Sequence, residues 1–112
     1  MSPKYFFAPD LIAEIEIPKQ GILSRTLHND DQVKLVLFGF SEGQELSAHT
    51  APMPASIYFL KGEASLMLGD EQMTVGAGSF AHMTANLRHA IVAKTPLVML
   101  LTMMKGSLPG GG

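Results

Sequence analysis

Turn-forming residues recur along this sequence at intervals of about five to ten residues, and no other feature limits the fold as strongly. These residues are Pro18, Gly21, Asn29–Asp31, Ser41–Gly43, Pro52, Pro54, Gly62, Gly69–Asp70, Gly76, Gly78 and Pro96. The segments between them are too short for ordinary helices and have the usual length of β-strands. Short strands separated by turns at this spacing predict an all-β sandwich or barrel.

Nine of these segments are predicted to be strands. They are Ile22–His28, Val33–Phe40, Glu45–Ala48, Ser56–Lys61, Ala64–Leu68, Glu71–Val75, Ser79–Met83, His89–Lys94 and Leu97–Met103. Gly69–Asp70, between two of them, predicts a hairpin with a tight turn. A weak helical pattern is confined to Asp10–Glu16, and Pro18 would end it.

Two of the predicted strands are apolar on both faces. Val33–Phe40 and Ser56–Leu60 lack the alternation that marks a strand with one face in water. Such strands need cover on both sides, from a second sheet or from another subunit. The aromatic residues Tyr5–Phe7 need cover as well. We therefore expect a homodimer to which the N-terminal segment contributes.

Length, composition and charge exclude several classes of protein. A chain of 112 residues forms one domain, and a hydrophobic content of 46% with 16% charged residues is typical of a folded protein. A net charge of −2 with only eight Lys and Arg residues makes nucleic acid a poor partner. The absence of cysteine excludes a disulfide framework, thiol catalysis and a thiolate metal site.

No membrane-spanning or targeting segment is expected. The most apolar stretch, Leu97–Met104, has eight residues, whereas roughly 20 are needed to cross a bilayer. Met1–Pro9 lacks the basic start and the long apolar run of a signal peptide. We therefore expect a cytoplasmic protein without a membrane partner.

Two stretches of the chain have the spacing of known sequence motifs. The first consists of Gly43, His49, Ala51, Ala55 and Gly62, and the second of Gly78, Thr84, Asn86, His89 and Ala93. This spacing resembles the two motifs of the cupin superfamily over roughly residues 33–103. The resemblance implies an RmlC-like jelly-roll barrel, also called a double-stranded β-helix. It predicts a barrel over 33–105, N-terminal strands or an arm over 1–32 at the barrel edge and in the dimer, and a flexible tail over 106–112.

The cupin resemblance also implies a metal site of three His and one Glu. His49 and His89 stand at two of the His positions, but Ala51 stands at the third and Ala55 at the Glu position. Two imidazoles alone leave a divalent ion surrounded mostly by water. We therefore expect that a divalent metal (Zn²⁺, Ni²⁺, Mn²⁺ or Fe²⁺) binds weakly or not at all, with His49 and His89 as its ligands.

The alternation of side chains along a strand predicts a mostly apolar pocket. Positions 49, 51, 53 and 55 would line one side of a regular strand, although Pro52 and Pro54 disturb that regularity. The predicted pocket residues are His49, Met53, Ile57, Phe59, His89 and Ile91. If Met83 points inward, His82 points outward and has a structural or interface role rather than binding metal.

The eight methionines are expected mainly to fill the core. Thioether sulfur also binds Cu(I), but these methionines do not form a short polar Met-rich loop. Met53 differs from the others because its position in the sequence predicts that it faces the pocket.

Three functions are compatible with this sequence. The first is the binding of a small molecule in the barrel pocket, in a sensory or accessory role, with weak or absent metal. The second, which the cupin resemblance implies, is a metal-dependent dioxygenase, isomerase or decarboxylase that uses His49 and His89. The third is a structural or interaction module with a vestigial pocket. The sequence favours the first, identifies no ligand and no catalytic residue, and leaves open whether a reaction occurs.

Overall fold

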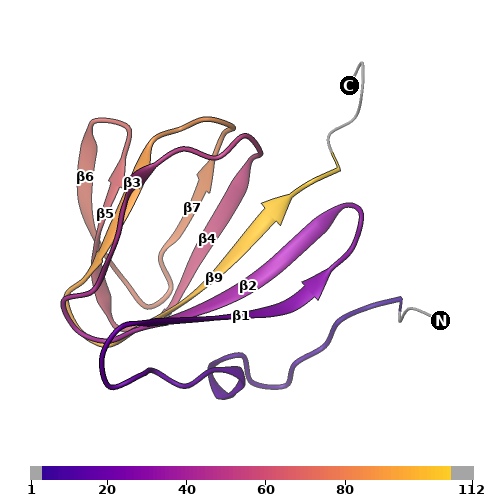
Figure 1. The fold of residues 1–112 in the computed structure, drawn as a ribbon, viewed down its shortest axis with the longest axis horizontal. Helices are drawn as coiled ribbons and strands as arrows, with labels where there is room; N and C mark the ends of the chain where they lie inside the picture. Colours follow the sequence, from indigo (N-terminus) through magenta and orange to yellow (C-terminus); the bar gives the residue numbers. More distant parts are fainter. Residues whose placement is uncertain (1–3, 107–112) are drawn as a thin grey trace.

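The computed structural model describes residues 4–106. Within these residues the chain forms nine β-strands and one short 3₁₀ helix (η1, Ile12–Glu14), without any α-helix (Figure 1). The strands are β1 (Ile22–Asn29), β2 (Val33–Phe40), β3 (Glu45–His49), β4 (Ala55–Lys61), β5 (Glu63–Leu68), β6 (Glu71–Gly76), β7 (Phe80–Met83), β8 (His89–Ala93) and β9 (Leu97–Met104). Every predicted strand is present, and each end lies within one residue of its predicted position.

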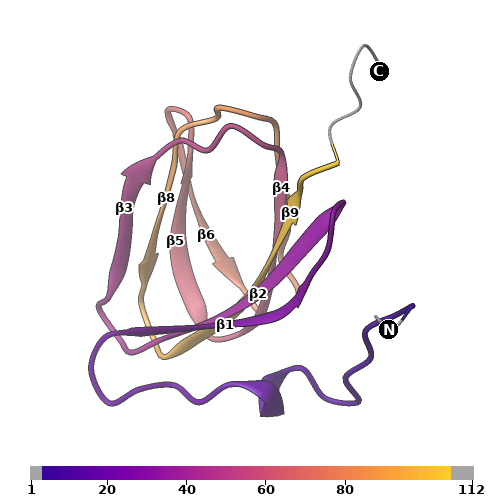
Figure 2. The same cartoon turned by 45° about the vertical axis from the view of Figure 1, so that its right-hand side comes forward.

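The strands form two antiparallel sheets that face each other. The five-stranded sheet has the order β1-β2-β9-β4-β7, and the four-stranded sheet has the order β3-β8-β5-β6 (Figure 2). The chain changes sheet repeatedly, so that β9 lies between β2 and β4 although it is the last strand. The all-β prediction is confirmed, and the arrangement is the predicted jelly roll.

Two glycines explain where the chain reverses. Gly69, with φ +61°, and Asp70 form the two-residue turn of the β5–β6 hairpin, and glycine suits the first position of such a turn. Gly62 lies between β4 and β5 with φ +89°. A Cβ atom on Gly62 would lie 2.1 Å from the carbonyl oxygen of Pro96, so no side chain fits at this crossing.

The core consists of the side chains that point inward from both sheets. Its largest members are Phe40, Ile57, Phe59, Leu66, Ile91, Leu97 and Met99, each at most 1% exposed. Alternate residues of β4 and of β9 belong to this set, as the period of two in a strand requires. Burying one such side chain contributes roughly 1.5–3 kcal/mol, so these residues account for much of the barrel's stability.

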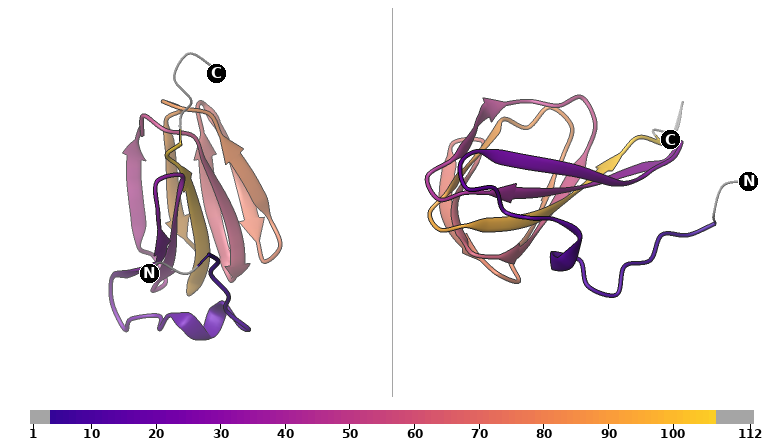
Figure 3. Two further views of the ribbon diagram at one scale, coloured as in Figure 1. Left: turned by 90° about the vertical axis from the view of Figure 1, so that its right-hand side faces the viewer. Right: turned by 60° about the horizontal axis from the view of Figure 1, so that its bottom comes forward.

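The N-terminal segment runs beside β1 and β2 before the first strand begins (Figure 3). The carbonyl oxygen of Glu16 lies 2.9 Å from the place where Gly39 would carry a Cβ atom, so this contact requires glycine in β2. Arg25 of β1 donates to the carbonyl oxygen of Glu14 at 2.8 Å and pairs with its carboxylate at 3.5 Å. The segment therefore supplies part of the cover that the outer face of β2 requires.

The first described residues extend away from this contact. Tyr5 and Phe7 are each 74% exposed, and the ring of Phe6 lies 6.4 Å from the imidazole of His28. His28 also bonds to the Asp30 carboxylate at 2.8 Å, in the turn between β1 and β2. This hydrogen bond, together with those from the Val33 and Gln32 N–H groups, lowers the pKa of Asp30 to about 2.

No helix within residues 4–106 is long and apolar enough to cross a membrane. The predicted tail begins at Gly106, and its remaining residues, 107–112, lie outside the described part of the chain, as do residues 1–3.

Candidate functional site

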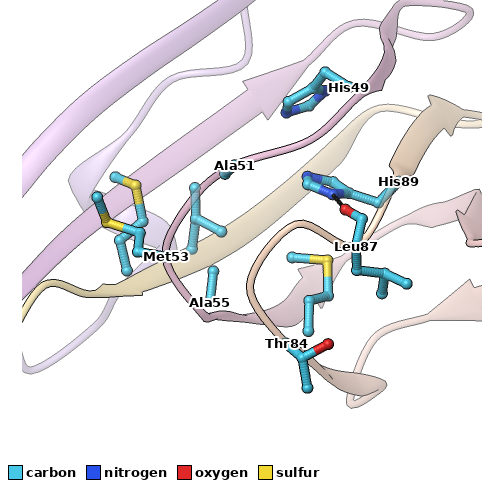
Figure 4. A pocket seen from close by; sticks show the side chains of 10 residues that line it. His49, Ala51, Met53, Ala55, Thr84, Leu87 and His89 are labelled. Atoms are coloured by element: carbon cyan, nitrogen blue, oxygen red, sulfur yellow. Dashed lines mark hydrogen bonds between the residues drawn. The ribbon is translucent and has the colours of Figure 1, made fainter. Parts of the chain in front are cut away.

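A cavity of about 100 Å³ lies between the two sheets (Figure 4). Strands of both sheets border it, together with the connecting residues 50–54 and 84–88. The lining residues are His49, Ala51, Met53, Ala55, Met83, Thr84, Leu87, His89, Leu101 and Met103. Apart from the two histidines and the threonine, the described lining is apolar.

The cavity contains half of the predicted pocket residues, namely His49, Met53 and His89. Ile57, Phe59 and Ile91 do not line it, because they are at most 1% exposed and pack within the closed core. The alternation along a strand predicts correctly that these three face inward. It does not specify the position along the barrel, and around these residues neighbouring side chains fill the space.

Ala51 and Ala55 also line the cavity, as the alternation over positions 49–55 predicts, and the other five lining residues are not predicted from the sequence, namely Met83, Thr84, Leu87, Leu101 and Met103. Two of them had a usable signal in the sequence. Thr84 stands at a motif position, and Met103 has the same parity in β9 as the buried Met99. The missing information was which end of β9 borders the cavity.

Residues 50–54 reach the cavity as a connection between the sheets rather than as part of a regular strand. β3 ends at His49 and β4 begins at Ala55 in the other sheet. Pro52 and Pro54 fall in this connection, where the missing N–H groups weaken no strand pairing. Ala51 and Met53 nevertheless line the cavity.

The two histidines lie against each other at the cavity. His49 of β3 and His89 of β8 are register partners, and their ring centroids are 4.3 Å apart with the planes tilted by 57° (Figure 4). His89 is 8% exposed, whereas His49 is exposed to solvent. The cavity is therefore accessible from the side of His49.

Irregular backbone supplies a hydrogen-bond acceptor to each imidazole. Nδ1 of His49 bonds to the carbonyl oxygen of Ser47 at 2.7 Å, and Nδ1 of His89 bonds to that of Leu87 at 2.9 Å. A register shift in β3 between Leu46 and His49 removes Ser47 from the regular pairing, and Leu87 precedes the first residue of β8. Neither carbonyl group therefore belongs to regular pairing between the two strands.

These bonds fix the tautomer of both rings. Because a carbonyl oxygen only accepts hydrogen bonds, the Nδ1 atoms of His49 and His89 must carry the proton. In each neutral ring Nε2 then has a free lone pair, which can bind a metal or accept a hydrogen bond.

The donor set does not fit the metal site of three His and one Glu. Within residues 4–106, no group of three or more His, Asp or Glu residues is placed to hold a metal ion. Ala51 and Ala55 line the cavity where the resemblance implies His and Glu. His82 does not supply a third donor, because its exposed ring lies outside the cavity and its Nδ1 bonds to the Ser56 hydroxyl at 2.9 Å.

A backbone hydrogen bond joins the two connecting segments. The N–H of Asn86 donates to the carbonyl oxygen of Ala51 at 2.7 Å. Asn86 has φ +67°, a conformation that asparagine tolerates better than most residues, and it stands where the second motif has glycine. The bond holds the Ala51 side of the cavity against the segment that carries Thr84 and Leu87.

The two-sheet barrel and the two motifs together define a class of protein. The sequence model of the Cupin domain matches residues 36–103. The chain therefore belongs to the cupin family.

Solved structures with similar folds agree with this assignment. A conserved protein of unknown function from Streptococcus pyogenes is 29% identical, with a TM-score of 0.82 covering 95% of this chain and 93% of that one. A cupin superfamily protein from Desulfitobacterium hafniense is 26% identical, with a TM-score of 0.81 covering 91% and 93%. An RmlC-like cupin from Shewanella frigidimarina, 18% identical, shares the fold with a TM-score of 0.78 covering 96% of both chains. A search of curated protein sequences finds no match.

Proposed function

We propose that this cupin binds a small, mostly apolar molecule in the barrel cavity and holds it by a hydrogen bond to the histidine pair. The supporting observation is an apolar lining next to two imidazoles whose Nδ1 atoms donate to backbone carbonyl groups, so that Nε2 of each neutral ring has a free lone pair. An unprotonated ring nitrogen accepts a hydrogen bond, so the ligand should carry a hydroxyl or N–H group. Its carbon skeleton would lie against alanine, leucine and methionine side chains.

The size of the cavity limits the ligand. Its volume of about 100 Å³ is smaller than the roughly 150 Å³ of an engineered apolar cavity that holds benzene. The enclosed space therefore suits about four to six non-hydrogen atoms. Any larger part of the ligand would extend past the exposed His49.

A matched pair of probes tests the proposal. 2-Butanol and 2-butanone are alike in size, but only the alcohol donates a hydrogen bond. We expect 2-butanol to shift the NMR signals of the cavity methyl groups of Met53, Met83 and Met103, with Met73 as an internal reference outside the lining. The ketone should bind about two- to tenfold more weakly, which is the value of one hydrogen bond.

Filling the cavity provides the control. Ala55→Leu places a larger side chain in the cavity and should abolish the shifts, whereas Ala77→Leu, at an exposed turn, should preserve them. Absence of any shift with either probe, or equal shifts in Ala55→Leu, would overturn the proposal.

A metal-dependent enzyme is the second candidate. The observation that favours it is the shared tautomer of His49 and His89, which leaves two nitrogen lone pairs at one cavity. It would require a further donor from the substrate or from water, since catalytic metal sites usually have three protein ligands. Loss of tight Zn²⁺ or Ni²⁺ binding in His49→Ala would support this candidate over the first.

We also propose that two copies of the chain associate. The exposed large apolar side chains include Tyr5 and Phe7 in the N-terminal segment, Phe80 on β7 (65% exposed) and Leu23 on β1 (44%). Exposed apolar surface of this kind is typical of interfaces. Light scattering should give about twice the 12.0 kDa of one chain, and deletion of residues 1–9 should weaken the association. A mass of one chain at micromolar concentration would contradict the dimer.

A further inference from the structure

Three methionines converge on the cavity that contains the histidine pair. They come from separate parts of the chain, with Met53 in the connection after β3, Met83 at the end of β7 and Met103 near the end of β9. Figure 4 shows Met53 across the cavity from the two imidazoles, with Ala51 and Ala55 between them. The cavity therefore combines two imidazole nitrogens with three thioether sulfurs, a larger donor set than the histidines alone provide.

These donors differ chemically from those of the His₃Glu pattern. Thioethers are soft ligands that select Cu(I), and imidazole binds copper as well as zinc. The hard oxygen donor of the pattern is absent, because Ala55 stands at the Glu position. Replacement of hard donors by soft ones shifts the preference of a site from hard divalent ions towards soft monovalent ions.

The lack of carboxylates in the described cavity lining also favours a monovalent ion over a divalent one. None of the described lining residues carries a carboxylate, so a bound cation would have only neutral ligands. The cost of transferring an ion into a medium of low dielectric constant rises with the square of its charge. A divalent ion would therefore lose about four times as much solvation energy here as a monovalent ion of the same radius.

We propose that the cavity is a Cu(I) site, with Nε2 of His49, Nε2 of His89 and at least one thioether among Met53, Met83 and Met103 as ligands. The site rests on the proposed function in one respect, since both require an open cavity beside the histidine pair. The long unbranched methionine side chain can adjust its sulfur position to an ion without moving the backbone. No oxidation or transfer step is involved, because the ion binds as Cu(I).

Anaerobic competition for Cu(I) against a chromophoric Cu(I) chelator tests the site. The wild-type chain should withdraw one Cu(I) per chain, and an equal concentration of Zn²⁺ should not displace it. His49→Ala, and the triple change Met53→Leu, Met83→Leu and Met103→Leu, should each weaken binding at least about tenfold. Met99→Leu is the matched control, because Met99 is a buried methionine of β9 outside the lining.

A second measurement needs no variant. Ag(I), a redox-inert soft ion, is added to the wild-type chain, so the result does not depend on whether the triple variant folds. That variant should fold in any case, because Met and Leu are similar in volume. The NMR methyl signals of Met53, Met83 and Met103 should move, whereas that of Met99 should not. Failure to compete with the chelator, or shifts confined to methionines outside the cavity, would overturn the site.

The two proposals at this cavity fail separately. Both probes are applied to the wild-type chain, 2-butanol for the small-molecule proposal and Cu(I) for the metal site. If 2-butanol binds and Cu(I) does not, only the metal site is wrong. If Cu(I) binds and neither organic probe does, the small-molecule proposal is wrong and the Cu(I) site stands.

Discussion

One end of the barrel interior is packed and the other is hollow, although the same strands build both. The inward-facing residues of β4 are Ala55, Ile57 and Phe59 in order, and only the first borders the cavity. On β8, His89 borders the cavity, whereas Ile91, two residues further, is buried in the core. Two residues of a strand span only about 6–7 Å. The change from packed core to cavity therefore takes place within one pair of residues along each of these strands.

The contrast predicts different responses to the loss of a large side chain. Phe59→Ala in the packed end should lower the free energy of unfolding by about 3–5 kcal/mol, because the side chain is fully buried and its removal leaves a new void. Met103→Ala should cost about 2 kcal/mol, at the low end for such a change, because Met103 is only half-buried. Urea denaturation of both variants measures the difference. Equal losses would mean that the two ends are packed alike.

Restoring the missing ligands should convert the hollow end into a divalent metal site. Ala51→His combined with Ala55→Glu should tighten the binding of Zn²⁺, Ni²⁺ or Mn²⁺ by about a hundredfold over the wild-type chain, measured by isothermal titration at pH 7.5. At pH 5.5 the binding should weaken strongly, because a protonated imidazole is no longer a ligand. The two single variants serve as controls. Without a gain in the double variant, residues 50–54 do not present these positions to one ion.

The histidine pair spans the boundary between packed and open surroundings. His89→Ala should destabilise the fold by about 1–2 kcal/mol, because the ring is buried and bonded to the Leu87 carbonyl. His49→Ala should change stability by less than about 0.5 kcal/mol, because the ring is exposed. Thermal unfolding of the two variants is the measurement, and the reverse order would refute the assigned burial of the pair.

A change distant from both ends should have the smallest effect. The pKa of Asp30 is lowered from 3.8 to about 2, mainly by the His28 hydrogen bond and then by the backbone N–H groups of Val33 and Gln32. Because the folded-state pKa lies below the unfolded value, the carboxylate contributes stability above pH 3.8, and this contribution is lost as the pH falls towards 2.

Asp30→Asn should therefore reduce the slope of stability against pH in that range while the binding properties of the cavity stay unchanged. Melting temperatures of the variant and the wild type between about pH 5 and pH 2 test this. Parallel curves would show that the carboxylate contributes nothing.

The strands were predictable because their signals are local. Turns at Gly62 and Gly69–Asp70 depend on backbone conformations that glycine adopts readily, so the residue type marks the reversal directly. The position of the cavity depends instead on how the two sheets approach each other. The sequence therefore predicts that Ile57 and Phe59 face inward, but not that the space beside them is filled.

The presence of several methionine sulfurs at one cavity was harder still to predict from the sequence. Met83 and Met103 are 20 residues apart in the sequence, and each has the signal of an ordinary core residue. Both are register partners of Ala55, because β4 pairs with β7 on one side and with β9 on the other. The register shift in β3 brings the Ser47 carbonyl group to His49, and no residue type in the sequence predicts this shift either.

The register shift in β3 has a consequence for local opening of the fold. β3 is the edge strand of its sheet, it pairs only with β8, and the shift interrupts that pairing between Leu46 and His49. Its amide protons should therefore exchange with water faster than those of the central β5 and β8. Each separation of β3 from β8 also carries His49 away from His89. Any species that bridges the two imidazoles would oppose this separation, so slower amide exchange at β3 would report occupancy of the cavity whatever its chemical identity.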